Sequence, residues 1–173
     1  MEFGIIAMLF FTLFFGIIEF GRFFYLYNTV QEVTRCAARE AVVNWSDQWD
    51  TITRDCVFRK GTTAPEVELV AGWEISNQNV SIRFLDKDFD EPSNNDMPKT
   101  PDQNIEMCQS DPPLAGCIRY VEASVRCTSG QNCDMATNRI IYKPMFGLIP
   151  LRVNIPNSTL TMPAESLGYG MTP

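Results

Sequence analysis

Three charged residues lie in or beside an otherwise apolar segment at the start of the sequence. Glu19 and Arg22 lie one helical turn apart near the end of this segment, and Glu2 lies at its start. A carboxylate and a guanidinium at positions i and i+3 of a helix can form an ion pair. Charges in a segment otherwise suited to lipid need partners, and partners from neighbouring copies could select one stagger between subunits. We therefore predict an assembly role for these charges; the alternative places Glu19 and Arg22 among lipid headgroups.

A second group is the acidic segment Asp86-Lys-Asp-Phe-Asp90, which has the spacing that opens a calcium loop. Glu91 stands where an EF-hand needs glycine, and Met97 stands where it needs its last glutamate, so an EF-hand is excluded. A solvated acidic loop is the favoured interpretation. A looser calcium site would use the carboxylates of Asp86, Asp88, Asp90 and Asp96.

The third group is the cysteines, which are even in number and form no CxxC motif: Cys36, Cys56, Cys108, Cys117, Cys127 and Cys133. Histidine is absent, so a zinc site would need four cysteines at spacings that this chain lacks. Disulfides in an oxidising compartment are the better interpretation. Short loops favour the pairs 108–117 and 127–133, and the pair 36–56 forms if a second helix folds back on the first.

Composition excludes other function classes. The 173-residue chain has no histidine, which removes histidine-based triads, proton shuttles and metal ligands. Its net charge of −7, with scattered basic residues, argues against a nucleic-acid partner. No serine has a base partner, and no glycine-rich loop resembles a phosphate cradle. We expect no catalytic residue, no cofactor and no enzymatic activity.

The charges belong to an element suited to a membrane or a helix bundle. The apolar run from Phe3 to Ile18 would span about 24 Å as a helix, slightly short of a ~30 Å hydrocarbon core, and the run can extend through Phe24. A secretory signal peptide would need a basic start and a small-residue cleavage site, which are absent. A plain membrane anchor stays open. The segment would also suit tight packing against other helices, because it combines the bulky side chains of Phe3, Phe10 and Phe14 with smaller residues at Thr12 and Gly16.

The helix is predicted to continue well beyond the apolar run. Tyr27, Val30, Val33, Cys36 or Ala37, Ala41 and Val42 or Val43 recur at helical spacing. No proline interrupts the chain before Pro65, so we expect one helix from Glu2 to about Trp45, roughly 65 Å long. Ser46-Asp47 marks a break and an N-cap for a short second helix over 48–57.

In the rest of the sequence, short segments alternate apolar and polar residues, as the strands of an antiparallel sheet do. Candidate strands are 67–75, 79–85, 118–127, 139–143, 151–155 and 160–162. In the third of these, Val121, Ala123 and Val125 share one face, which is typical of a sheet with one wet side. The predicted fold is α+β: a helical segment over 1–45 packs on a disulfide-rich, extracytoplasmic globular head over 46–173.

The opening "MEFGIIAMLFFTLFFGIIEFGR", followed by "CAAREAVV", resembles the start of the TadE-like family of pilins and pseudopilins. The late run "YKPMFGLIPLRV…STLTMPAES" is similar to that family's final strands. The resemblance implies a bacterial surface-appendage subunit of the tight-adherence, type IV-like class. Its implied partners are copies of itself in a helical filament, the inner membrane before assembly, the pilus assembly machinery and a prepilin peptidase.

The resemblance also implies a role for Glu2, which would neutralise a neighbour's terminal amine during assembly. In type IV pilins this glutamate is the fifth residue of the mature protein, whereas here it is residue 2 of the sequence. Either cleavage occurs at an unusual place, or this numbering does not begin at the mature terminus. A filament subunit is the leading interpretation. The alternatives are a low-copy subunit that initiates or tips the pilus, and a bitopic inner-membrane protein with a periplasmic binding domain.

Overall fold

The computed structural model describes residues 2–57, 63–93, 96–127, 133–134, 136–146 and 153–168. Its elements, in chain order, are α1 (Glu2–Val43), η1 (Ser46–Gln48), α2 (Trp49–Val57), β1 (Glu68–Leu69), β2 (Gly72–Ser76), η2 (Asn77–Asn79), β3 (Val80–Leu85), α3 (Pro101–Gln109), β4 (Tyr120–Val125), β5 (Cys133–Asp134), β6 (Arg139–Ile141), β7 (Asn154–Ile155) and β8 (Ser158–Pro163). The α+β fold with a long N-terminal helix and antiparallel sheets is therefore confirmed.

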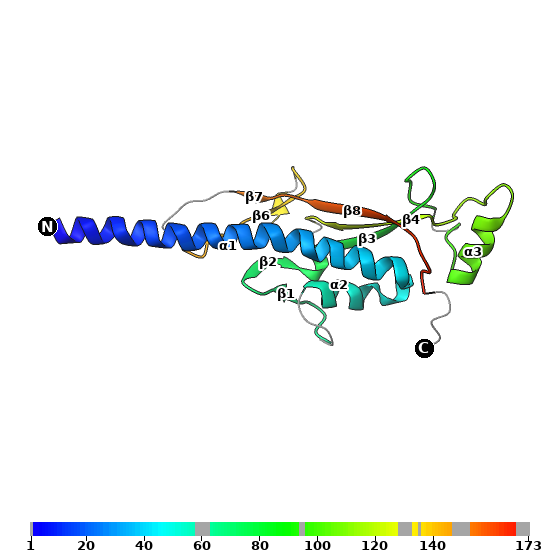
Figure 1. Ribbon diagram of the computed structural model, residues 1–173, viewed down its shortest axis with the longest axis horizontal. Helices are drawn as coiled ribbons and strands as arrows, with labels where there is room; N and C mark the ends of the chain where they lie inside the picture. The colour runs from blue at the N-terminus through cyan, green and yellow to red at the C-terminus, as the bar shows by residue number, and fades with distance from the viewer. Residues whose placement is uncertain are drawn as a thin grey trace.

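The long helix α1 organises the molecule. It runs 42 residues without a break, which corresponds to about 63 Å. Figure 1 shows its N-terminal part projecting as a bare rod, while the head gathers around its C-terminal part. The predicted continuous helix is confirmed, and it ends at Val43, two residues earlier than expected.

The main sheet has the strand order β3-β4-β8, all antiparallel. Its apolar face packs on α1: Val121, Ala123 and Val125 of β4 are buried against the helical stripe. That stripe consists of Leu26, Val30, Val33, Ala37 and Ala41. Its spacing of three and four residues places every member on one side of the helix. The sheet predicted to lie on the amphipathic half of α1 is confirmed; Tyr27, predicted in the stripe, is exposed, and the preceding Leu26 is buried in its place.

Two smaller β elements complete the head. The strands β5-β6-β7 form an antiparallel sheet, and β1-β2 form a hairpin. The prediction of one strand over 67–75 is wrong, because the chain reverses at Val70-Ala71, where Ala71 has a φ of 58°. In the view of Figure 1 the hairpin lies below α1, and β6 and β7 lie above it.

Two helices and three disulfides fasten the remaining segments. Helix α2 begins one residue after the predicted start and buries Ile52 and Val57. Helix α3 was not predicted; Thr100 caps its first turn, accepting a hydrogen bond from the Gln103 N–H. The structure joins Cys36–Cys56, Cys108–Cys117 and Cys127–Cys133, which are the three predicted pairs. The first pair ties α2 to α1.

Candidate assembly site

The first half of α1 presents an almost wholly apolar surface to its surroundings. The large exposed side chains on it are Phe3, Ile5, Ile6, Met8, Leu9, Phe10, Phe11, Leu13, Phe14, Ile17, Ile18, Phe20 and Phe24. The helix is long and apolar enough to cross a membrane. A soluble domain rarely exposes a continuous apolar surface of this extent unless lipid or protein covers it.

The residues predicted for helix packing lie on this surface. Phe3, Phe10 and Phe14 are exposed, and the rings of Phe10 and Phe14 stack with their centroids 6.1 Å apart. The Thr12 hydroxyl donates to the Met8 carbonyl one turn earlier at 2.8 Å, so it adds no unpaired polar group to the surface. Gly16 is half-buried. Glu2 lies in the first turn of α1.

Arg22 is buried against the head and uses all of its donors there. Its Nη2 donates to both carboxylate oxygens of Glu74 in β2, at 2.7 and 2.8 Å. Nε donates to the Ala71 carbonyl at 2.9 Å, and Nη1 donates to the Lys143 carbonyl at 2.8 Å. The guanidinium also lies over the Trp73 ring, 4.0 Å from the ring centroid, in a cation–π contact.

Glu19 is even more deeply buried, with 1% of its surface exposed. Its carboxylate accepts the backbone N–H groups of Met145 (3.1 and 3.2 Å) and Phe146 (3.3 Å) and the hydroxyl of Tyr142. The predicted ion pair with Arg22 exists at 3.6 Å, which is longer than these hydrogen bonds. Backbone amides and one phenol therefore hold Glu19 more closely than its helical neighbour does.

Tyr142 connects the two charges. Its hydroxyl donates to Glu19 and accepts from Arg22 Nη1 at 3.3 Å. Burial, and then the hydrogen bond to the Glu19 carboxylate, raise the pKa of Tyr142 above its usual range. Lys143 N–H donates to Glu74 Oε1 at 3.1 Å, so the second carboxylate is also held by backbone. We call Glu19, Arg22, Glu74 and Tyr142 the charge cluster.

The charge cluster corrects one expectation from the sequence. Glu19 and Arg22 were assigned partners in neighbouring subunits, with lipid headgroups as the alternative. Their partners are instead in the head of the same chain, at sequence separations from 49 to 127 residues. Burying a charge costs free energy unless it is paired and hydrogen-bonded, and here both charges are. The cluster fixes where the head sits along α1.

Glu74 and Tyr142 were missed in the sequence. Glu74 is a buried acidic residue in "GWEIS", a strand whose alternation places it on the same face as buried Gly72. Tyr142 follows two β-branched residues in "IIYKP". An acidic residue on the buried side of a strand was the available signal that Arg22 had a partner elsewhere in the chain.

The acidic segment does not form the looser calcium site. Asp86 Oδ1 accepts the backbone N–H groups of Asp88 and Asp90 at 2.8 and 3.1 Å, which is a local turn. The Lys87 ammonium pairs with Asp88. Across the ranges that the structure describes, which include all four candidate aspartates, no three metal-ligating side chains are grouped to hold an ion.

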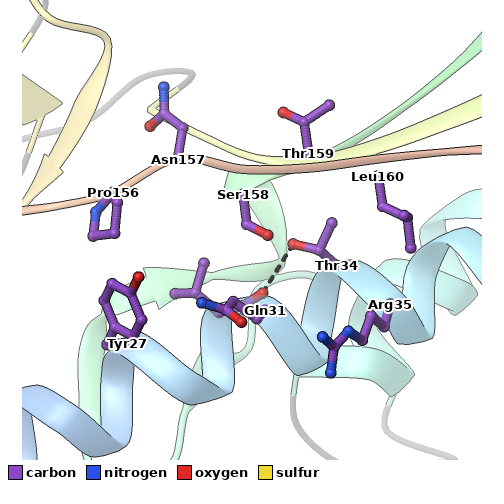
Figure 2. A pocket seen from close by; sticks show the side chains of 10 residues that line it. Tyr27, Gln31, Thr34, Arg35, Pro156, Asn157, Ser158, Thr159 and Leu160 are labelled. Atoms are coloured by element: carbon purple, nitrogen blue, oxygen red, sulfur yellow. Dashed lines mark hydrogen bonds between the residues drawn. The ribbon is translucent and has the colours of Figure 1, made fainter.

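A groove of about 330 Å³ lies between α1 and β8. Figure 2 shows Ser158 pointing toward the helix, while Asn157 and Thr159 point away from it. Tyr27, Gln31 and Arg35 line the helical side. The groove follows β8, an edge strand of the main sheet as far as the structure describes it.

Comparison with known proteins adds one finding. No curated protein and no solved structure matches the chain. The match to a family model covers the part of α1 that carries the exposed apolar surface, the buried pair Glu19 and Arg22, and every residue of the buried stripe except Ala41. Residues 1–39 match the family model described as TadE-like protein, so the expected resemblance is confirmed over the N-terminal helix.

Proposed function

We propose that this chain is a structural subunit of a Tad-type, type IV-like pilus, which polymerises through the exposed half of α1. The observation that carries the proposal is the long apolar rod that projects from a folded, disulfide-bonded head. The match of residues 1–39 to the TadE-like family supports a role in such a system. In this proposal the rod crosses the inner membrane before assembly and lies in the filament core afterwards.

The rod suits both surroundings for a physical reason. Lipid chains and neighbouring apolar helices are equally free of hydrogen-bonding groups, so transfer between them leaves no new polar group unpaired. The charges that would oppose this transfer, Glu19 and Arg22, are already neutralised within the chain. The disulfide-bonded part of the head stays outside the membrane, where its three disulfides are stable.

Glu2 is the remaining charge on the rod. We assign it the pairing with a neighbouring subunit's terminal amine that the family resemblance implies. Glu2→Ala should leave the protein inserted and disulfide-bonded but lower the ratio of sheared extracellular subunit to membrane-bound subunit. Removing one partner of a buried ion pair costs about 3–5 kcal/mol, and the cost recurs at each subunit.

The matched control is Glu32→Ala, which removes an exposed carboxylate from the same helix. It should assemble as the wild type does. A wild-type ratio for Glu2→Ala would exclude the pairing. If wild-type cells shed no filament that contains this chain, the polymer itself is excluded, and a bitopic membrane protein becomes the better interpretation.

A further inference from the structure

Between Phe15 and Phe24 the helix has two different faces. One face carries Glu19 and Arg22 and is sealed by the head. The other carries Ile17, Phe20 and Phe24, which are exposed. The apolar surface of the rod therefore does not stop where the head begins, but continues beside it for more than two helical turns.

The length of the exposed part of α1 determines which part of the molecule a membrane must cover. The head reaches the helix at Phe15, whose ring lies 4.6 Å from that of Phe146. Residues 3–14 span only about 18 Å, whereas a hydrocarbon core is ~30 Å thick. From Phe3 to Phe24 the helix spans about 32 Å, which fills the core. A membrane matched to this surface overlaps the base of the head.

The base of the head has the composition of a membrane interface. Val70 at the β1–β2 turn is 59% exposed, and Trp73 and Met145 are also exposed. They lie at the level of Arg22, which hydrogen-bonds the intervening Ala71 carbonyl and lies over the Trp73 ring. Tryptophan is enriched where hydrocarbon meets headgroups. Lys143 is exposed in the same region and can reach phosphates; Glu68, also exposed, lies two residues before Val70.

We propose that Val70, Trp73 and Met145, here called the collar, are immersed in the interfacial layer of the outer leaflet before assembly. This inference rests on the membrane stage of the proposed function. The charge cluster then lies within the membrane boundary, enclosed by the collar and α1. The charged groups of the cluster therefore have to pair with one another, because a charge at that depth is not solvated by water. The occupant of the collar is lipid, since the collar continues the apolar surface of a membrane-spanning helix.

The test places a diazirine amino acid at single positions of the full chain, reconstituted in vesicles of phosphatidylethanolamine and phosphatidylglycerol. Position 70 probes the collar. Position 114 is the matched control, because Leu114 is 57% exposed on the segment that follows α3 at the far end of the head. Position 9 reports on the rod. After illumination we expect lipid adducts at 9 and 70, with at least about tenfold less adduct at 114.

Each other outcome overturns a distinct claim. Adducts at 9 but not at 70 reject the immersed collar and leave the membrane-spanning rod intact. No adduct at 9 rejects the membrane stage of the proposed function. Adducts from 70 to a second copy of the chain reject lipid in favour of a subunit contact.

A second readout needs no photoreactive residue in the collar. Brominated lipids should quench Trp73 fluorescence, measured as the difference between wild type and Trp73→Phe. Trp45 and Trp49 supply the common background, since both pack on Phe84 in the core of the head. Unquenched Trp73 in vesicles rejects the proposal.

Discussion

At the scale of single residues, the charge cluster shows how an apolar helix tolerates an ion pair. Arg22 has an acceptor for each of its nitrogens, and Glu19 accepts two backbone N–H groups and one hydroxyl. A second pair on α1, Glu32 and Arg35, has the same i,i+3 spacing but is exposed, with 4.0 Å between its charged atoms. Because the two pairs have the same spacing, a comparison of them isolates the effect of burial on how much an ion pair contributes to stability.

Arg22→Met should destabilise the head strongly. The substitution leaves the Glu74 carboxylate buried without its guanidinium partner, and breaking a buried pair in this way costs about 3–5 kcal/mol. Arg35→Met should cost about 0–1 kcal/mol, because an exposed pair gains little over hydrated charges. Thermal unfolding in detergent micelles, followed by circular dichroism, compares the two. Equal midpoints for the two variants would show that the cluster does not hold the head.

Tyr142 should make stability sensitive to alkaline pH. Its pKa is raised in the folded chain, so its contribution is complete below the unfolded value of about 10 and is lost as pH rises toward the folded value. Tyr142→Phe should cost about 1.5–3 kcal/mol at neutral pH, because a hydrogen bond to a charged group is lost. The cost should shrink above pH ~10.

The measurement for Tyr142 is the unfolding midpoint across pH for wild type and Tyr142→Phe. Tyr120→Phe is the control, because it removes a phenol that lies outside the cluster, against Phe89. A wild-type alkaline slope in Tyr142→Phe would contradict the assignment.

Among the helices and strands, the structure shows which sequence patterns predicted an element correctly. Val30, Val33 and Ala37 follow the period of a helix, and apolar residues alternate with polar ones in the sequence of β4 from Val121 to Val125, so local rules predicted both elements. The β1–β2 hairpin was missed because its turn, Val70-Ala71, lacks the Asn-Gly or Asp-Gly signal of a tight turn. Helix α3 was missed although Thr100-Pro101-Asp102 carries the N-cap, first-turn proline and acidic residue of a helix start. The charge cluster could not be predicted from local rules, because Glu74 and Tyr142 meet α1 only after the head has folded.

Two glycines test how closely the β1–β2 hairpin packs on α1. A Cβ at Gly72 would clash with Leu26 Cδ2, and Leu26 is fully buried, so Gly72→Ala should cost about 1–3 kcal/mol through overpacking. A Cβ at Gly21 meets open space, so Gly21→Ala should be neutral or stabilising by about 0.5–1 kcal/mol. Unfolding midpoints in detergent decide between them. If Gly72→Ala were as stable as Gly21→Ala, the hairpin would not be held against Leu26.

At the scale of the whole molecule, α1 is one helix with two sets of partners. Its C-terminal half is buried by the main sheet and by α2, which is linked to it through Cys36–Cys56. Most of its N-terminal half is exposed. The charge cluster lies at the boundary between the halves and fixes the position of the head relative to the exposed half of α1. A rigid connection of this kind would give every head the same height and orientation on a filament.

The two halves should therefore respond differently to the same change. Ile17→Lys places a charge on the exposed face, so the head should fold with its three disulfides while the chain fails to enter filaments. A lysine near the centre of a membrane helix costs about 2.5–3.5 kcal/mol or more on insertion, and in a filament core it would lack a counter-charge. Val33→Lys places the same charge in the buried stripe and should prevent folding of the head itself. Non-reducing electrophoresis reports on the head, and the ratio of sheared to membrane-bound subunit reports on assembly. Ile17→Lys with a wild-type ratio would show that the exposed half of α1 is not the polymerising surface.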